Sequence, residues 1–102
     1  MPKSVIPLLV NRDFAQQAIR RLVSEGKFAV ERHAREAMSD PERNVPMRLV
    51  LETLKGGTID QGPHRDATGD WRCRVRRRCA GKYVRVVVAL SDYDYMYVVT
   101  VY

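Results

Sequence analysis

The stretch WRCRVRRRCAGKYVRVVVAL, residues 71–90, decides the fold. Apolar and charged side chains alternate through most of its first half, and its second half is rich in valine, which is typical of two strands. Ala80-Gly81 separates the halves and predicts a tight two-residue turn between antiparallel strands. That turn sets the register and places Arg76 directly opposite Arg85 on the neighbouring strand.

A third strand is predicted over residues 95–102, after a turn at residues 91–94. One face of the resulting antiparallel sheet is apolar and forms the predicted core face. Its members are Trp71, Cys73, Val75, Val84, Val86, Val88, Leu90, Tyr95, Tyr97, Val99 and Val101. Arg77 alone interrupts the alternation, so we expect a bulge or a frayed edge near it.

The opposite face of this sheet is predicted to be basic. It carries Arg72, Arg74, Arg76, Arg78, Tyr83, Arg85, Val87, Met96, Val98, Thr100 and Tyr102. Two rows are expected to cross it, Arg76–Arg85–Thr100 and Arg78–Tyr83–Tyr102. Like charges directly opposite each other destabilise a sheet, so Arg76 facing Arg85 indicates a counter-anion. That anion is either a bound phosphate or an acidic neighbour, for which Asp66, Asp70 and Glu52 are the candidates.

The residues before the sheet read as helical. Three helices are predicted. The first has a capping pair at Asp13 and Gln16 and ends at Gly26, and the second covers about residues 31–39. The third begins near Asn44, has Pro46 in its first turn and ends at Gly56-Gly57. Residues 27–30 are expected to be extended, residues 58–60 to form a short strand, and residues 61–70 to form a polar surface loop.

The predicted fold class is therefore α+β, with N-terminal helices packed on one face of a C-terminal antiparallel sheet of three to four strands. A single domain is expected over residues 1–102, with about residues 1–10 as an extended N-terminal segment. The 45% hydrophobic content excludes global disorder. No apolar stretch is long enough for a signal peptide or a membrane span, so a soluble, cytoplasmic protein with no membrane partner is expected.

The positive charge is concentrated in one part of the chain. The formal net charge is +6, from 18 Lys+Arg against 12 Asp+Glu, and residues 71–91 contain seven of the cations and no acid. A clustered positive field favours a polyanionic partner such as RNA or DNA. The alternative is a solvated face whose arginines keep an exposed strand from aggregating.

The sequence predicts no metal site and no cofactor. Cys73 and Cys79 lie six positions apart on one strand face, roughly 20 Å, which is too far for a disulfide. Their spacing does not match a zinc site, and the carboxylates are scattered. The two histidines are the remaining candidates for proton transfer. His33 lies on the second predicted helix, where it is either catalytic or a semi-buried helix residue, and His64 is expected to be a solvated loop residue.

Three motifs carry a family resemblance: ERHAREAM at residues 31–38, LKGG at residues 54–57 and VVTVY at residues 98–102. They resemble an uncharacterised domain-of-unknown-function family that is grouped with the barnase–EndoU–colicin–RelE-like (BECR) ribonuclease fold. That RelE-like fold includes mRNA-cleaving toxins of bacterial toxin–antitoxin systems. Residues 18–26 and Gly81-Lys82-Tyr83 also resemble the MqsR branch of those toxins.

The resemblance implies an active site with His33 on a helix, Arg76 and Arg85 on the central strands, and a hydroxyl from Thr100 or Tyr102. It implies a metal-independent RNA endonuclease, a toxin-like mRNA interferase that cleaves single-stranded RNA by attack of the 2′-hydroxyl. The residues expected to bind nucleic acid beside this site are Arg72, Arg74, Arg78, Lys82 and Tyr83. RNA and an acidic antitoxin protein are the expected partners. A non-catalytic RNA- or DNA-binding module and a basic protein-interaction domain are the alternatives.

Overall fold

The computed structural model describes residues 11–79, 81–92 and 95–102. Within these ranges the elements are α1 (Arg12–Glu25), β1 (Phe28–Val30), α2 (Arg32–Ser39), α3 (Met47–Gly56), β2 (Thr58–Arg65), β3 (Trp71–Cys79), β4 (Lys82–Asp92) and β5 (Tyr95–Val101). The predicted α+β class is confirmed, with a larger sheet than expected. The expected N-terminal segment over residues 1–10, Ala80 of the predicted turn and residues 93–94 lie outside the described residues.

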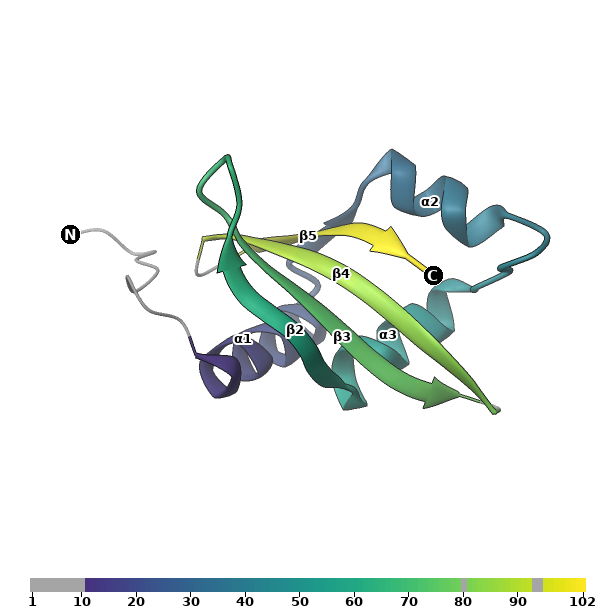
Figure 1. The fold of residues 1–102 in the computed structure, drawn as a ribbon, viewed down its shortest axis with the longest axis horizontal. Coiled ribbons are helices and arrows are strands. Elements are labelled where there is room, and N and C mark those ends of the chain that lie inside the picture. Colours follow the sequence, from purple (N-terminus) through teal and green to yellow (C-terminus); the bar gives the residue numbers. More distant parts are fainter. Residues whose placement is uncertain (1–10, 80, 93–94) are drawn as a thin grey trace.

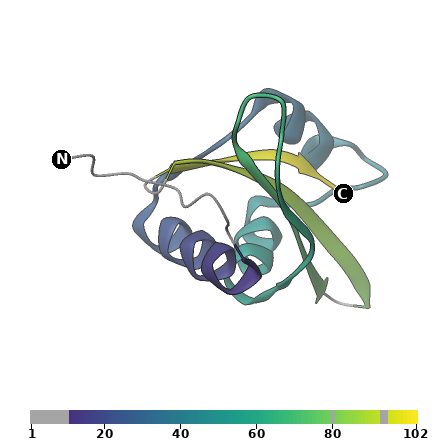
Figure 2. The same ribbon diagram turned by 60° about the vertical axis from the view of Figure 1, so that its left-hand side comes forward.

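The sheet has the order β1-β5-β4-β3-β2. Its pairings are antiparallel except that of β1 with β5, which is parallel. Helices α1 and α3 lie together on one side of the sheet, and β5 separates them from α2 in both views (Figures 1 and 2). The core lies between the α1–α3 pair and the sheet, and its fully buried side chains include Ile19, Leu22, Val50, Leu54, Val75, Val86, Val88 and Val98. None of the described helices is long and apolar enough to cross a membrane.

The pairing of β3 with β4 agrees with the prediction at every tested position. Arg76 lies opposite Arg85, and Arg78 lies opposite Tyr83. The register continues without a shift through Arg77 to Cys79, so the expectation of a bulge or a frayed edge near Arg77 is wrong. Arg77 instead lies where α3 ends, and its Nη1 is 3.6 Å from Oε2 of Glu52. A charged side chain is tolerated at this core-side position because it reaches solvent past the end of the helix.

The first half of β5 faces the opposite way to the prediction. Met96 and Val98 are fully buried, whereas the predicted core residues Tyr95, Tyr97 and Val99 are only half-buried. The cause is a register shift: Val88 pairs with Val98 and Val87 with Thr100, which leaves Val99 as an extra residue. One extra residue exchanges the two faces of a strand, so the alternation before and after it is out of phase.

The same shift changes the residue that faces Arg85. Arg85 and Tyr102 exchange backbone N–H···O hydrogen bonds of 2.7 and 2.9 Å, so Tyr102, not Thr100, completes the row that begins with Arg76. The predicted row from Arg78 through Tyr83 to Tyr102 is therefore wrong as well. Thr100 still lies on the basic face, one row further along, and Val101 is buried as predicted.

The N-terminal half also differs from the prediction at its element boundaries. Residues 61–65, expected to be loop, continue β2, which pairs with β3 through two register shifts. An edge strand accepts such irregularities because one side of its backbone has no partner strand. Pro46 is the N-cap of α3 and does not lie in its first turn.

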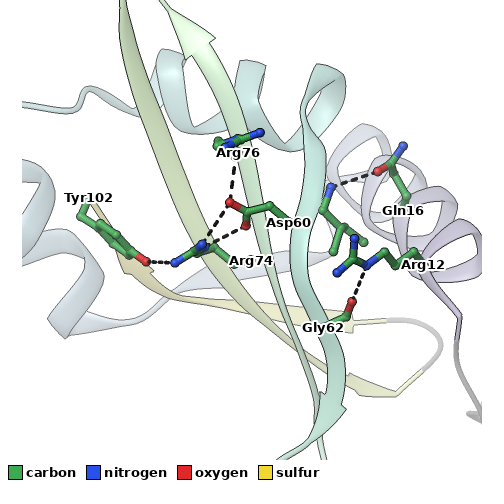
Figure 3. Close-up of polar contacts among 8 residues, drawn as sticks. Arg12, Gln16, Asp60, Gly62, Arg74, Arg76 and Tyr102 are labelled. Carbon is green, nitrogen blue, oxygen red and sulfur yellow. Dashed lines mark hydrogen bonds and ion pairs between the residues drawn. The ribbon is translucent and has the colours of Figure 1, made fainter.

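The N-cap of helix α1 and its contacts with β2 differ from the prediction. Asn11 is its N-cap, and Asn11 Oδ1 accepts a hydrogen bond from the Phe14 N–H. Gln16, expected in a capping pair, instead accepts a hydrogen bond from the Ile59 N–H through its Oε1 at 3.2 Å. Arg12 Nε donates to the Gly62 carbonyl at 2.9 Å, so two side chains of α1 hold β2 in place (Figure 3).

Replacing Gly57 by Ala should destabilise the protein by about 1–3 kcal/mol, because the site has no room for a side chain. A Cβ there would lie 2.5 Å from the Thr53 carbonyl oxygen and 2.7 Å from that of Arg76, and both are backbone atoms. Gly56→Ala is the matched control, since its nearest neighbour is the flexible Arg77 side chain at 3.5 Å. Urea denaturation measures both variants, and an equal loss at the two positions would contradict this account.

Candidate functional site

The candidate site lies on the sheet face opposite α1 and α3. We call it the arginine face and define it by Arg72, Arg74, Arg76, Arg78, Tyr83, Arg85 and Tyr102. The alternation of β3 sets this arrangement: Trp71, Cys73 and Val75 are buried, and the residue that follows each of them is an arginine on the opposite face. The sheet therefore presents a row of guanidinium groups to solvent along one strand.

Asp60 of β2 pairs with two arginines of the arginine face. Arg74 donates from Nε and Nη2 to the two Asp60 carboxylate oxygens at 2.8 and 3.0 Å, and Arg76 Nε lies 3.8 Å from Asp60 Oδ2 (Figure 3). The Asp60 side chain is 17% exposed and that of Arg74 23% exposed. The hydrogen bond from Arg74, followed by the charges of Arg74, Arg76 and Arg85, lowers the pKa of Asp60.

Tyr102 is the other partner of Arg74. Arg74 Nη1 donates to the Tyr102 hydroxyl oxygen at 2.9 Å, which fixes the position of that hydroxyl beside the arginines (Figure 3). The hydrogen bonds to Asp60 and Tyr102 together raise the pKa of Arg74. A guanidinium that already has two partners is a positioning group, so the neighbouring arginines are the better candidates for binding a ligand.

Within the described residues, none of the three acidic neighbours considered from the sequence pairs with Arg76 or Arg85. Asp70 accepts a hydrogen bond from the Thr68 hydroxyl at 3.4 Å. Asp66 accepts a hydrogen bond from Arg72 Nε at 2.9 Å, and its hydrogen bonds with Thr68 and Arg72 lower its pKa. Glu52 pairs with Arg77 on the helix side of the sheet. Among the described side chains, no carboxylate forms an ion pair with Arg85 or Arg78, so Asp60 alone does not neutralise this face.

Sequence reasoning missed Asp60, although a signal for it was present. Residues 58–60 read as a strand next to the arginine-rich strand, and Asp60 is the acidic residue within it. The irregular pairing of β2 with β3 hid the contact, because Asp60 lies within the first of the two register shifts, between Ile59 and Gln61, and such a shift cannot be deduced from alternation.

Two tyrosine rings lie among the guanidinium groups of the arginine face. The ring of Tyr83 has the Cζ atoms of Arg76, Arg85 and Arg78 at 4.7, 5.6 and 5.8 Å from its centroid. Arg85 also lies 6.0 Å from the ring of Tyr102. Cation–π attraction offsets part of the repulsion between facing arginines. The two rings remain 46% and 38% exposed, so their outer surfaces are open to a ligand.

Of the five residues predicted to be catalytic, the structure brings together Arg76, Arg85 and Tyr102. Thr100 is half-buried one row away. His33 is the second residue of α2 and is exposed. The Glu31 N–H donates to the Val98 carbonyl at 2.9 Å, so α2 begins beside β5.

Within the described part of the chain, no hydrogen bond or ion pair joins the imidazole of His33 to the arginine face. His64 lies on β2, not in a loop, and is exposed. Lys82 is exposed at the first position of β4, beside the turn, where it pairs with Cys79 of β3.

The remaining candidate groups are the thiols and the metal ligands. Cys73 and Cys79 are free, and burial raises the pKa of the Cys73 thiol to about 12. A thiol held so strongly protonated is a core group and not a nucleophile. The described residues contain no group of three His, Cys, Asp or Glu side chains that could hold a metal ion.

A family model described as a domain of unknown function, DUF4258, matches residues 30–102. The chain belongs to this family. The DUF4258 segment covers α2, α3 and strands β2 to β5, so it contains the whole arginine face and His33. The predicted membership of an uncharacterised family is thereby confirmed. No similarity to a curated protein or to a solved structure was found.

Replacing Asp60 by Asn should lower the free energy of unfolding at neutral pH by about 1–2 kcal/mol, because it removes a carboxylate that two arginines share. Folding lowers the pKa of Asp60, so its contribution is present above the ordinary aspartate pKa of 3.8 and is lost as the pH falls below that value. Wild type and variant should therefore converge in acid. Urea denaturation across this pH range measures the difference.

Glu36→Gln is the control for this prediction. Glu36 forms an exposed ion pair with Arg32, which contributes little to stability. We expect its effect to stay within about 0.5 kcal/mol at every pH. A difference between wild type and Asp60→Asn that does not shrink in acid would contradict the role given to the Asp60 carboxylate.

Proposed function

We propose that this DUF4258 protein is a metal-independent endoribonuclease that acts on single-stranded RNA, in the manner of a toxin-like mRNA interferase. The observation that carries the proposal is Arg85 directly opposite Arg76 on an open sheet face, with the rings of Tyr83 and Tyr102 beside Arg85. Membership of the BECR ribonuclease fold is part of the proposal. The motif resemblance around His33 and the α+β architecture support it.

The chemistry of the arginine face matches a single strand of RNA. Guanidinium groups bind phosphate oxygens through paired N–H donors. Exposed tyrosine rings stack on bases, which are accessible in a single strand and hidden in a duplex. Arg85, which has no described carboxylate partner, is therefore the expected contact for a phosphate. Arg76 would help to neutralise the negative charge of that phosphate.

In the proposed reaction the 2′-oxygen attacks the adjacent phosphorus. A base removes the 2′-hydroxyl proton, the new O2′–P bond forms, and the P–O5′ bond breaks. The products are a 2′,3′-cyclic phosphate and a 5′-hydroxyl, whose proton comes from a general acid. Arg76 and Arg85 would stabilise the extra negative charge of the transition state, a role that does not require a metal ion.

The proton-transfer roles are assigned to Tyr102 and His33. Tyr102 is the proposed acid, because Arg74 holds its hydroxyl oxygen and leaves its own proton available for donation. His33 is the proposed base, on the strength of the motif resemblance and the titration range of imidazole. Thr100, one row from Tyr102, would contact the ribose or the phosphate.

The second candidate function is a non-catalytic RNA-binding module. The observation that favours it is the position of His33, which has no described contact with the arginine face. Such a module would need the arginines and tyrosines but not the histidine. In either case an acidic protein segment, such as an antitoxin, would compete with RNA for the same guanidinium groups.

Purified protein should cleave single-stranded RNA in excess EDTA and leave 2′,3′-cyclic phosphate ends. Replacing His33 by Ala should abolish cleavage and leave RNA affinity nearly unchanged, because the side chain is exposed and lies outside the arginine face. His64→Ala is the matched control, since this second histidine is also exposed. Intact RNA after incubation with folded wild-type protein would exclude the nuclease and leave the binding module.

Replacing Arg85 by Gln should weaken RNA binding and lower the slope of log affinity against log salt concentration by about 0.7, because one phosphate contact is lost. The same change removes the repulsion with Arg76, so thermal stability should not fall. Arg48→Gln is the control, since this arginine pairs with Glu52 on α3. Fluorescence anisotropy with labelled RNA measures both variants, and an equal loss in the control would indicate a general effect of net charge.

A further inference from the structure

A groove of about 390 Å³ lies beside the arginine face. Its floor is apolar and includes Val45 and Val84, which are buried, and Leu49, which is half-buried. Tyr83 and Tyr102 form the side that adjoins the arginines. The volume is at the lower end of the range of about 300–1,000 Å³ for ligand sites in proteins.

Arg85 of the arginine face lies close to two residues that line the groove. Its guanidinium carbon lies 5.6 Å from the ring centroid of Tyr83 and 6.0 Å from that of Tyr102, and both rings line the groove. A phosphate bound to Arg85 would therefore lie at the mouth of the groove. The nucleotide that carries this phosphate could turn its base inward onto the apolar floor.

Part of the groove lining comes from the turn between α2 and α3. The Asn44 N–H donates to the Asp40 carbonyl at 2.7 Å, and the Val45 N–H donates to the Met38 carbonyl at 3.2 Å. Asn44 has a φ of 43°, in the left-handed region that asparagine tolerates better than most residues. This fixed turn places Asn44 on the groove lining, where its amide can both donate and accept hydrogen bonds.

We propose that the groove binds one nucleobase of the RNA strand, stacked on Tyr83, with the Asn44 amide at the edge of the base. Charge complementarity favours a nucleotide as the occupant, because the lining has two cationic side chains, Arg43 and Lys82, against one acidic side chain, Glu42, and Arg85 lies beside it. The inference rests on the proposed function, since the strand on the arginine face supplies the base. It adds a subsite that would make cleavage or binding depend on base identity next to the phosphate.

The test uses RNA with one 2-aminopurine base and 2′-O-methyl sugars, which prevent attack by the 2′-oxygen. Stacking of 2-aminopurine on Tyr83 should quench its fluorescence when the RNA binds. The Tyr83→Thr variant should show no quenching and should bind the RNA about tenfold more weakly. Tyr83→Phe retains the ring and should retain both, and Tyr83 is exposed, so neither change should prevent folding.

An RNA that lacks one base distinguishes binding in the groove from binding to the arginines. Removing the base should cost the wild type about tenfold in affinity and cost Tyr83→Thr much less, because the stacking contact is already absent from that variant. Asn44→Gly, which keeps the left-handed backbone, should bind the four bases with more equal affinities. If the abasic site weakens wild type and Tyr83→Thr equally, the base does not bind on Tyr83, and the proposed function still stands. If wild type binds no RNA at all, the groove and the proposed function fail together.

Discussion

The pairing of Arg76 with Arg85 across β3 and β4 is the constraint on which the rest of the structure depends. The register that buries Val75, Val86 and Val88 against the helices unavoidably brings the two guanidinium groups together on the other face. The fold accommodates this repulsion with the ring of Tyr83 and with the carboxylate of Asp60, which reaches Arg76 from β2. Core packing and the candidate site are thus two results of a single alternating pattern.

The central hairpin could be predicted from the sequence because two independent signals agree there. A two-residue turn sets the register, and the alternation along β3 leaves one pairing that places Val75, Val86 and Val88 together on the core face. The first half of β5 could not be predicted, because the extra residue Val99 reverses the faces and nothing in the string VVTV marks where it falls. The limits of β2 were missed because residues 61–65 have the composition of a loop and pair as an irregular edge strand.

The candidate site likewise contains residues that could be predicted from the sequence and residues that could not. Arg76, Arg85 and Tyr83 follow from the hairpin and lie where alternation places them. Tyr102 reaches the arginines through a register that the sequence does not reveal, and Asp60 does so through a strand with two register shifts. The groove depends on the turn between α2 and α3, whose approach to the hairpin is a tertiary contact without a local sequence signal.

The two outer strands of the described sheet have a consequence for the behaviour of the protein in concentrated solution. β1 has only three residues, and β2 is broken by two register shifts and contains Gly62 and Pro63. Neither presents a long, regular row of free N–H and C=O groups, while the valine-rich part of β4, residues 86–90, is paired with a strand on both sides. Edge-to-edge addition of one sheet to another is therefore disfavoured, which protects a strongly β-prone hairpin from self-association.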